Sequence, residues 1–166
     1  MNKTYYILLR GSLGIGKTTI AKKLAKILRA DYISIDKILK NMNLDELDQK
    51  QGCVPLNNFL KADEKIIPTI KESLEKGKKV IIECCFYHKE NIEHIIHNLN
   101  FKNYVITLKA PVEVCLERDR KRKKCLGKKA AIEVHKLVSR FDHGIIINTE
   151  NKTEDQVVKE IMEKLK

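Results

Sequence analysis

The chain has 166 residues, of which 43% are hydrophobic and 5% aromatic, and its formal net charge is +11 at pH 7. This length predicts a single domain over residues 1–166 with its own hydrophobic core, and no apolar run reaches the roughly 18 residues that a transmembrane helix needs. The positive charge favours an anionic partner, either nucleotide phosphates or nucleic acid, although solvated lysine-rich helices would produce the same charge.

Apolar runs that are typical of buried strands alternate with segments whose apolar residues recur at helical spacing. The pattern predicts five strands, at 5–10, 31–35, 79–85, 104–108 and 145–148. Between and after them it predicts helices at 17–28, 59–76 and 89–99, from 111, and at 130–141 and 153–165. We expect Pro68 to kink or split its helix, Gly77 to end it, and Thr153 to form a capping box with Gln156. The alternation predicts an α/β fold, a three-layer α/β/α sandwich around a five-stranded parallel sheet.

A complete nucleoside-triphosphate motif, Gly11-x-x-x-x-Gly16-Lys17-Thr18, follows the first strand and opens the first helix. The glycines let successive backbone N–H groups turn toward phosphate oxygens, and the helix N-terminus adds a partial positive charge. Lys17 supplies a point charge for the β- and γ-phosphates, and the Thr18 hydroxyl is a ligand for Mg²⁺. We therefore expect the following residues to bind ATP: Gly11, Leu13, Gly14, Ile15, Gly16, Lys17, Thr18 and Thr19.

This motif alone does not separate kinases, GTPases and motor ATPases. Asn151-Lys152-Thr153-Glu154 resembles the guanine-reading N-K-x-D of GTPases, but Glu154 stands where that motif has Asp. No D-x-x-G switch element precedes it where a GTPase would carry one. Thr153 and Glu154 are more simply interpreted as the start of the last helix.

Two acidic residues lie at or near the ends of predicted strands. Asp36 follows the second strand, and the segment 37–55 after it is polar and irregular, with room for one helical piece near its start. Because ligands bind at the carboxyl edge of open α/β sheets, we expect Asp36 to face the phosphate loop. The alternative is that it only caps a helix beginning at Lys37. Glu83 lies within the otherwise apolar third strand, where a charge needs a partner.

The five cysteines form no C-x-x-C pair and are odd in number. The first residues do not resemble a signal or transit peptide, so we expect free thiols in a cytoplasmic protein without a membrane partner. Cys84-Cys85-x-x-His88 is conceivable as part of a metal site with His94 and His97. Because no zinc-finger spacing follows, a buried strand end is the better interpretation.

A dense basic stretch at 118–129 follows the helix that Pro111 opens. Arg118 and Arg122 are spaced i, i+4, so we expect them to share one helical face and to reach the nucleotide together, with Arg120 pointing elsewhere. Arginine forks stabilise the charge that spreads over a moving phosphoryl group. The alternative interpretation is a basic surface helix, and Arg140 is a further candidate at the end of the helix at 130–141.

Four segments together resemble the small P-loop kinases: the motif at 11–19, Tyr-Ile-Ser-Ile-Asp at 32–36, the arginines at 118–122 and Phe-Asp-x-Gly-Ile-Ile-Ile at 141–147. This group of the P-loop NTPase superfamily includes shikimate kinase, gluconate kinase, adenylylsulfate kinase, chloramphenicol phosphotransferase and the kinase domain of polynucleotide 5′-kinases. The resemblance implies a nucleoside-monophosphate-kinase-like sheet with the strand order 2-3-1-4-5. It also implies a mobile basic lid at about 118–130.

The resemblance also implies roles for particular residues. Asp36 would accept or orient the proton of an acceptor hydroxyl and help to hold Mg²⁺, and Glu83 would contact Mg²⁺-bound water or the acceptor. A Glu followed by Cys84 and Cys85 departs from the more usual Asp followed by Gly or Thr. The implied catalytic residues are Lys17, Asp36, Arg118 and Arg122, with Arg118 also binding nucleotide. The implied metal ligands are Thr18, Asp36 and Glu83.

These features predict an ATP- and Mg²⁺-dependent phosphotransferase that acts on a hydroxyl of a small molecule. One alternative is a polynucleotide or RNA 5′-hydroxyl kinase, which the charge of +11 favours and the aromatic content of 5% disfavours, since few rings could stack on bases. Another is a non-catalytic regulatory module, which the departure at 83–85 favours and the intact Lys17, Thr18 and Asp36 disfavour. The acceptor pocket is predicted from 37–59 and 86–88, and no pattern in the sequence identifies the acceptor.

Overall fold

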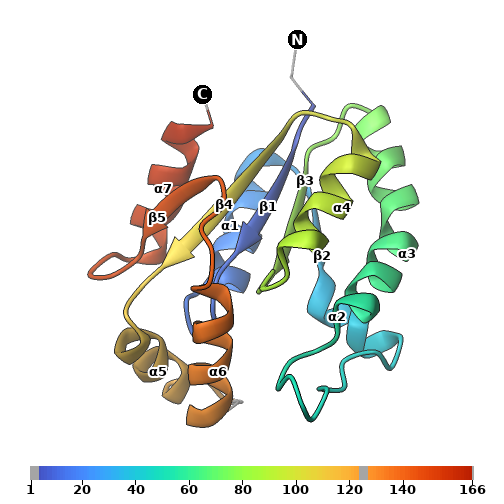
Figure 1. The fold of residues 1–166 in the computed structure, drawn as a ribbon. Coiled ribbons are helices and arrows are strands. Elements are labelled where there is room, and N and C mark those ends of the chain that lie inside the picture. Colours follow the sequence, from blue (N-terminus) through green and yellow to red (C-terminus); the bar gives the residue numbers. More distant parts are fainter. Residues whose placement is uncertain (1–3, 124–126, 166) are drawn as a thin grey trace.

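The computed structural model describes residues 4–123 and 127–165. Within them, one five-stranded sheet has the order β2-β3-β1-β4-β5, and every pairing is parallel, as predicted (Figure 1). The strands are β1 (Tyr6–Arg10), β2 (Asp31–Ser34), β3 (Val80–Cys84), β4 (Asn103–Lys109) and β5 (Ile145–Asn148). The helices are α1 (Lys17–Leu28), α2 (Ile35–Asn41), α3 (Leu56–Glu75), α4 (Lys89–Leu99), α5 (Val112–Arg120), α6 (Lys128–Val138) and α7 (Glu154–Lys164).

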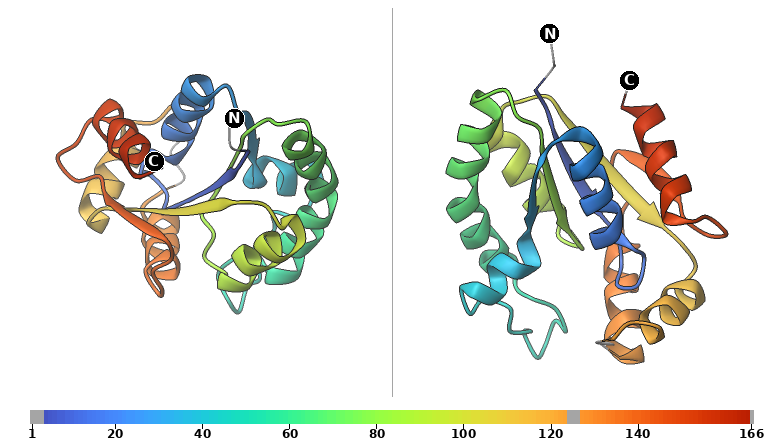
Figure 2. Two further views of the ribbon diagram at one scale, coloured as in Figure 1. Left: turned by 90° about the horizontal axis from the view of Figure 1, so that it is seen from above. Right: turned by 180° about the vertical axis from the view of Figure 1, so that it is seen from behind.

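Helices cover both faces of the sheet and so give the three predicted layers (Figure 2). Successive residues of β1 point to opposite faces, so Leu8 packs in a core cluster with α3 and α4, while Leu9 packs in another cluster with α1 and α7. Every residue of β1 and β3 is buried, as expected for central parallel strands. The register pairs Glu83 with Leu9 on one side and with Ser34 on the other. The segments that follow β1, β2 and β3 therefore emerge at the same edge.

The alternative in which Asp36 caps a helix from Lys37 is wrong, and Pro68 does not split its helix. The helix after β2 begins at Ile35, with Ser34 in an extended conformation before it, so Asp36 lies inside the first turn and does not cap a helix that starts at Lys37. Helix α3 runs without a break through Pro68. Because Pro68 is exposed to solvent, the carbonyl that loses its helical partner has access to water.

Two predicted helix ends are confirmed. Gly77 has φ of 80°, and the N–H groups of Gly77 and Lys78 donate to the carbonyls of Leu74 and Ser73 at 3.0 Å each, which closes the end of α3. At the start of α7, the Gln156 N–H donates to Thr153 Oγ1 at 3.2 Å and the Thr153 N–H donates to the Gln156 side chain at 2.8 Å. The last helix therefore starts where its capping box predicts.

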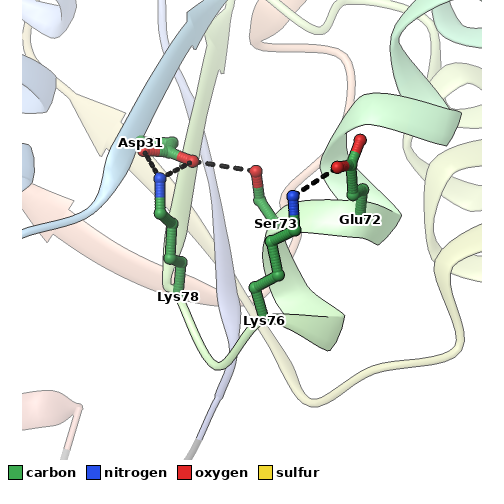
Figure 3. A network of polar contacts seen from close by, with 5 residues as sticks. All are labelled: Asp31, Glu72, Ser73, Lys76 and Lys78. Atoms are coloured by element: carbon green, nitrogen blue, oxygen red, sulfur yellow. Dashed lines mark hydrogen bonds and ion pairs between the residues drawn. The ribbon is translucent and has the colours of Figure 1, made fainter.

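A polar network holds the opposite edge of the sheet, where β2 and β3 begin (Figure 3). Ser73 Oγ at the end of α3 donates to Asp31 Oδ2 at 2.8 Å, and Lys78 Nζ lies 3.3 Å from both Asp31 oxygens. Lys76 pairs with Glu72 one turn back on α3. This network fastens the end of α3 to the start of β2 and lies away from the edge where the motif residues meet.

The part of the chain that the structure describes contains no helix long and apolar enough to cross a membrane. Cys53, Cys84, Cys85 and Cys115 are buried free thiols, as predicted, and Cys125 lies outside the described residues. Over residues 4–123 and 127–165, no three His, Cys, Asp or Glu side chains gather in a way that could hold a metal. The ring of His88 instead contacts the Val54 carbonyl, so the Cys84-Cys85-x-x-His88 segment is a buried strand end followed by an ordinary polar histidine.

Candidate active site

The loop between β1 and α1 forms an open cradle of backbone. Gly14 and Gly16 have φ of 77° and 97°, in the left-handed region that favours glycine. A Cβ on Gly14 would lie 2.2 Å from the carbonyl oxygen of Cys115, so the loop also touches the backbone of α5 at a point where only glycine fits. Lys17 opens α1, is 7% exposed, and donates from Nζ to the Ser12 carbonyl at 3.1 Å. The cradle therefore has the shape that a phosphate group requires.

A cavity of about 410 Å³ lies over this cradle. It is lined by Leu13, Gly14, Gly16, Lys17, Thr18, Thr19, Asp36, Glu83, Arg118, Lys121, Arg122 and Glu154. Of the residues expected to bind ATP, Gly11 is buried and does not line this cavity, and Ile15 lines the neighbouring cavity. Lys121 and Glu154 also line the cavity, although neither was predicted as a site residue. A further hollow of about 490 Å³ against α6 and β5 meets the cradle only at Ser12.

The electrostatics of the cavity keep Lys17 charged. Burial alone would lower the pKa of Lys17, but the acidic side chains that neighbour it raise this pKa above the ordinary value. Those neighbours are Cys85, Glu83 and Asp36. A lysine held in its charged form at the bottom of a phosphate cradle is suited to neutralise phosphate oxygens.

Glu83 is buried with 2% of its surface exposed, and one of its two oxygens is satisfied by hydroxyl groups. Thr18 Oγ1 donates to Glu83 Oε1 at 3.0 Å, and the Tyr32 hydroxyl donates to the same atom at 2.8 Å. Glu83 Oε2 has no hydrogen-bond partner among the described residues. A buried carboxylate oxygen without a partner is costly unless something else meets it.

These donors fit a magnesium ion. Thr18, Glu83 and Asp36 offer hard oxygen atoms beside the cradle, which is the chemistry that Mg²⁺ prefers. Since three acidic side chains do not converge in the described part of the chain, phosphate oxygens and water would have to complete the coordination. Mg²⁺ commonly keeps several waters in nucleotide sites of this kind.

Asp36 lines the same cavity from the first turn of α2 and is open to solvent. The Cys84 thiol donates to Asp36 Oδ1 at 3.4 Å. Burial raises the pKa of Cys84 well above its ordinary value, so the thiol keeps the proton that it donates. Although the Asp36 side chain is exposed at the cavity wall, the protein atoms packed around it displace part of its water and raise the pKa of its carboxyl group. Lys17 lowers this pKa, and repulsion from Glu83 raises it. Asp36 is therefore a more basic carboxylate than an isolated aspartate.

The arginines of the predicted lid differ in their surroundings. Arg118 donates to the Thr149 hydroxyl at 2.9 Å and to the Thr149 carbonyl at 2.8 Å. Arg122 is half-exposed and lies 3.6 Å from Asp119. Both line the cavity, whereas Arg120 is exposed and does not. Because α5 ends at Arg120, the expectation that Arg118 and Arg122 share one helical face is wrong, and they meet at the cavity because the chain turns there.

The predicted lid region extends beyond Arg118 and Arg122. Residues 124–126 are outside the described residues. Arg140 follows the end of α6 and is exposed, and it does not line the cradle cavity.

A second cavity, of about 290 Å³, continues from the first and shares Gly16, Arg118 and Glu154 with it. Its remaining lining residues are Ile15, Ile20, Thr149, Lys152, Thr153 and Val157. Lys152 in its wall pairs with Glu160 at 2.7 Å, and Thr153 caps α7, as the simpler interpretation of this segment predicts. Apolar side chains beside polar backbone suit a flat heterocyclic base.

The segment before α3 packs against the residues after β3. The Val54 N–H donates to the Tyr87 hydroxyl at 3.0 Å, and His88 Nε2 lies 2.9 Å from the Val54 carbonyl. Phe59 meets Tyr87 edge to face, with ring centres 5.4 Å apart. The structure thus brings together the two regions from which the acceptor pocket is predicted.

Comparisons with known proteins agree with this geometry. A family model described as an AAA domain matches residues 7–139. The chain is 30% identical over 167 residues to a putative adenylate kinase from Methanocaldococcus jannaschii, a match that covers 96% of this chain and 85% of that relative. It is 29% identical over 117 residues to a shikimate kinase from Azobacteroides pseudotrichonymphae, covering 68% of this chain and 64% of that relative.

Among solved structures, the fold is similar to that of an unliganded sugar kinase from Janibacter sp. HTCC2649. The TM-score is 0.80 at 17% sequence identity, and the match covers 98% of this chain and 94% of the other. At this identity the similarity concerns the fold.

Proposed function

This chain belongs to the AAA-domain family of P-loop kinases, and we propose that it is an ATP- and Mg²⁺-dependent phosphotransferase that acts on a hydroxyl group of a small molecule. The observation that carries the proposal is the single cavity shared by the phosphate cradle, Lys17, Asp36 and Glu83. A nucleotide-binding module without catalysis would not need a basic carboxylate facing the cradle. We expect the enzyme to work in the cytoplasm, where its thiols remain reduced.

The two connected cavities support a particular orientation of the nucleotide. The triphosphate would lie in the cradle and the base in the second cavity, with Arg118 between them. Lys17 would neutralise the β- and γ-phosphates, and Arg118 and Arg122 would stabilise the charge that spreads over the transferred group. Bound Mg²⁺ would add positive charge at the phosphates, with Thr18 as its protein ligand and Asp36 and Glu83 reaching it through water.

Asp36 supports a hydroxyl acceptor. Its carboxylate lies at the cavity wall, where it could accept the proton of an alcohol as the oxygen attacks the γ-phosphorus. The thiol of Cys84 would hold one carboxylate oxygen and leave the other for the acceptor. A monophosphate acceptor would meet the repulsion of both Asp36 and Glu83, so a neutral hydroxyl fits this wall better.

The relatives are consistent with small-molecule acceptors. The shikimate kinase and the sugar kinase are named for small molecules that are not nucleotides, and the putative adenylate kinase is named for a nucleotide. Polynucleotide ends remain the second candidate, because Lys121 and Arg122 line the cavity and belong to the stretch 118–129, whose sequence is rich in lysine and arginine.

An acceptor screen tests the proposal. The protein, Mg²⁺ and ATP are incubated with sugars, hydroxy acids, nucleosides, nucleoside monophosphates and 5′-hydroxyl oligonucleotides, and ADP formation is measured. We expect a non-nucleotide alcohol to stimulate ADP formation in wild-type protein. If only nucleoside monophosphates or only oligonucleotide ends stimulate ADP formation, the proposed acceptor class is wrong.

A further inference from the structure

Arg10 is the last residue of β1, directly before the phosphate loop, and its side chain is completely buried. It forms no ion pair with any residue in 4–123 or 127–165, so its charge is balanced without a carboxylate in direct contact. A buried guanidinium of this kind is costly unless its N–H groups are well satisfied. The hydrogen-bond partners of its guanidinium therefore decide whether this burial is tolerated.

The guanidinium binds the end of α6. Nη2 donates to the Val138 carbonyl at 2.9 Å, and Nη1 donates to the Phe141 carbonyl at 3.1 Å. The Phe141 ring lies against the same group, with 4.2 Å between its centre and the guanidinium carbon. Val138 is the last residue of α6, and carbonyls at a helix C-terminus carry partial negative charge. The helix end and the ring thus stabilise the charge at close range, and Asp142 acts on it without a direct ion pair.

Two further bonds lead to other parts of the site. Nη1 also donates to Thr107 Oγ1 of β4 at 3.2 Å, and Nε donates to the Phe86 carbonyl at 3.3 Å. Phe86 is buried with φ of 47°, a left-handed conformation that a phenylalanine adopts only when its surroundings hold it. It directly precedes Tyr87 and His88, which pack on the segment before α3.

Helix α6 in turn lies beside α5, which carries Arg118. His135 Nε2 of α6 lies 2.9 Å from the Ala110 carbonyl just before α5, and the start of α5 meets the phosphate loop where Ser12 Oγ lies 3.4 Å from Cys115 Sγ. Arg10 is therefore connected to helices α5 and α6, which we call the α5–α6 arm and which include Arg118. It is also connected to the segment 86–88, from which part of the acceptor pocket is predicted.

We propose that Arg10 is a positioning residue that fixes the α5–α6 arm and the 86–88 segment relative to the phosphate cradle. Its effect on nucleotide binding passes through the arm to Arg118. The inference rests on the proposed function, because it assumes that a nucleotide occupies the cradle and meets Arg118. It predicts that Arg10 and Arg118 contribute to nucleotide affinity as one unit rather than independently.

A double-mutant cycle tests this by calorimetry with the non-hydrolysable ATP analogue AMPPNP and Mg²⁺. We expect Arg10→Met and Arg118→Ala each to weaken binding about tenfold, and the double variant to lose about tenfold rather than about a hundredfold. The control is Lys102→Met, which removes an exposed cation lying 4.9 Å from the ring centre of Tyr104 and should bind as wild type.

Since Arg10→Met leaves buried carbonyls without a donor, it is paired with Phe141→Leu, which removes only the ring beneath the guanidinium. We expect Phe141→Leu to weaken binding about threefold in wild type and not at all in Arg118→Ala, with the thermal midpoint recorded for each variant. Losses that multiply, or a folded Arg10→Met with wild-type affinity, would overturn the inference and leave the proposed function intact. A wild-type protein that binds no AMPPNP would overturn both.

Discussion

Two carboxylates that lie in one cavity have different environments. Glu83 is buried and accepts bonds from Thr18 and Tyr32, whereas Asp36 is open to solvent and is held by a single thiol. Two acidic groups in different environments are typical of sites in which one group binds a ligand and the other transfers a proton. We assign the proton to Asp36 for this reason.

The substitution Asp36→Asn tests that assignment. The amide matches the carboxylate in shape and can still meet the Cys84 thiol, but it cannot take a proton. We expect AMPPNP affinity to stay within about threefold of wild type, while transfer to the acceptor falls by about 10² or more. Binding and transfer are measured on the same preparation. If the variant transfers phosphate to the acceptor at the wild-type rate, another residue is the base, and Glu83 is the next candidate.

At the scale of residues, sequence patterns locate the cradle well because its chemistry needs a fixed spacing of glycine, lysine and threonine. They do not identify Tyr32 or Arg10 as part of the site. Tyr32 matters only because β2 lies beside β3, which places its hydroxyl at Glu83. Arg10 matters because segments about 76 to 131 residues further along the chain meet its guanidinium. Such contacts are set by topology and leave no periodic signal.

Among the elements, α5 is held against the phosphate loop by a glycine contact. Gly14→Ala would place a Cβ 2.2 Å from the Cys115 carbonyl and would also strain a residue with φ of 77°. We expect a loss of about 1–3 kcal/mol in the free energy of unfolding and at least a tenfold loss of AMPPNP affinity, since the loop or α5 must move.

The matched control for this prediction is Gly77→Ala. Gly77 has a similar φ of 80°, but no atom lies within 4 Å of the added Cβ. It should lose about 1 kcal/mol of stability and no nucleotide affinity. Equal affinities for the two variants, measured by calorimetry, would show that the Gly14 contact does not shape the cradle.

A buried acid lies between α3 and α4. Asp63 is completely buried and accepts a bond from the Asn91 side chain, with His94 Nδ1 at 3.2 Å. Burial raises the pKa of Asp63 to about 8, against the effect of Asn91 and with that of Glu64. The folded protein therefore holds a proton here that the unfolded chain, with an ordinary pKa of 3.8, releases.

A raised pKa in the folded state makes the stability of the protein fall as the pH rises. Stability from protonated Asp63 is complete below the unfolded pKa and is lost as the pH rises toward about 8, by up to about 1.4 kcal/mol per pH unit. Asp63→Asn, which cannot titrate, should flatten the decline in the free energy of unfolding between pH 5 and pH 8. Denaturant melts at several pH values measure this. Parallel curves for the two proteins would show that Asp63 is ionised in the folded state.

The order of the elements could be predicted because strands and helices alternate with clear apolar patterns and because the phosphate loop fixes which strand is first. The start of α2 could not, because Ile35 continues the strand pattern of Ile33 beyond Ser34, the residue at which β2 ends. The continuity of α3 through Pro68 depends on which face of that helix meets the core, and this is decided by packing against α4 and the sheet.

Over the whole molecule, the charge of +11 predicts attraction to any polyanion. If a polynucleotide were the substrate, lysines and arginines of the lid would contact its phosphates, and affinity would fall with a log–log slope of about −0.7 per contact on a single strand. We expect only weak binding of oligonucleotides that disappears near physiological salt. Fluorescence titrations at several salt concentrations measure this, and salt-resistant binding to 5′ ends would favour the polynucleotide kinase.

The most direct test of the account follows the γ-phosphate itself. Protein is incubated with Mg²⁺ and γ-labelled ATP in the presence of the small-molecule acceptor that the screen selects, and labelled product is compared between wild type and Lys17→Ala. Because Lys17 is the buried charge at the bottom of the cradle, its removal should reduce label transfer by about 10² or more while the protein remains folded. Equal transfer by the two proteins, or no transfer from ATP to any small-molecule hydroxyl, would contradict the account.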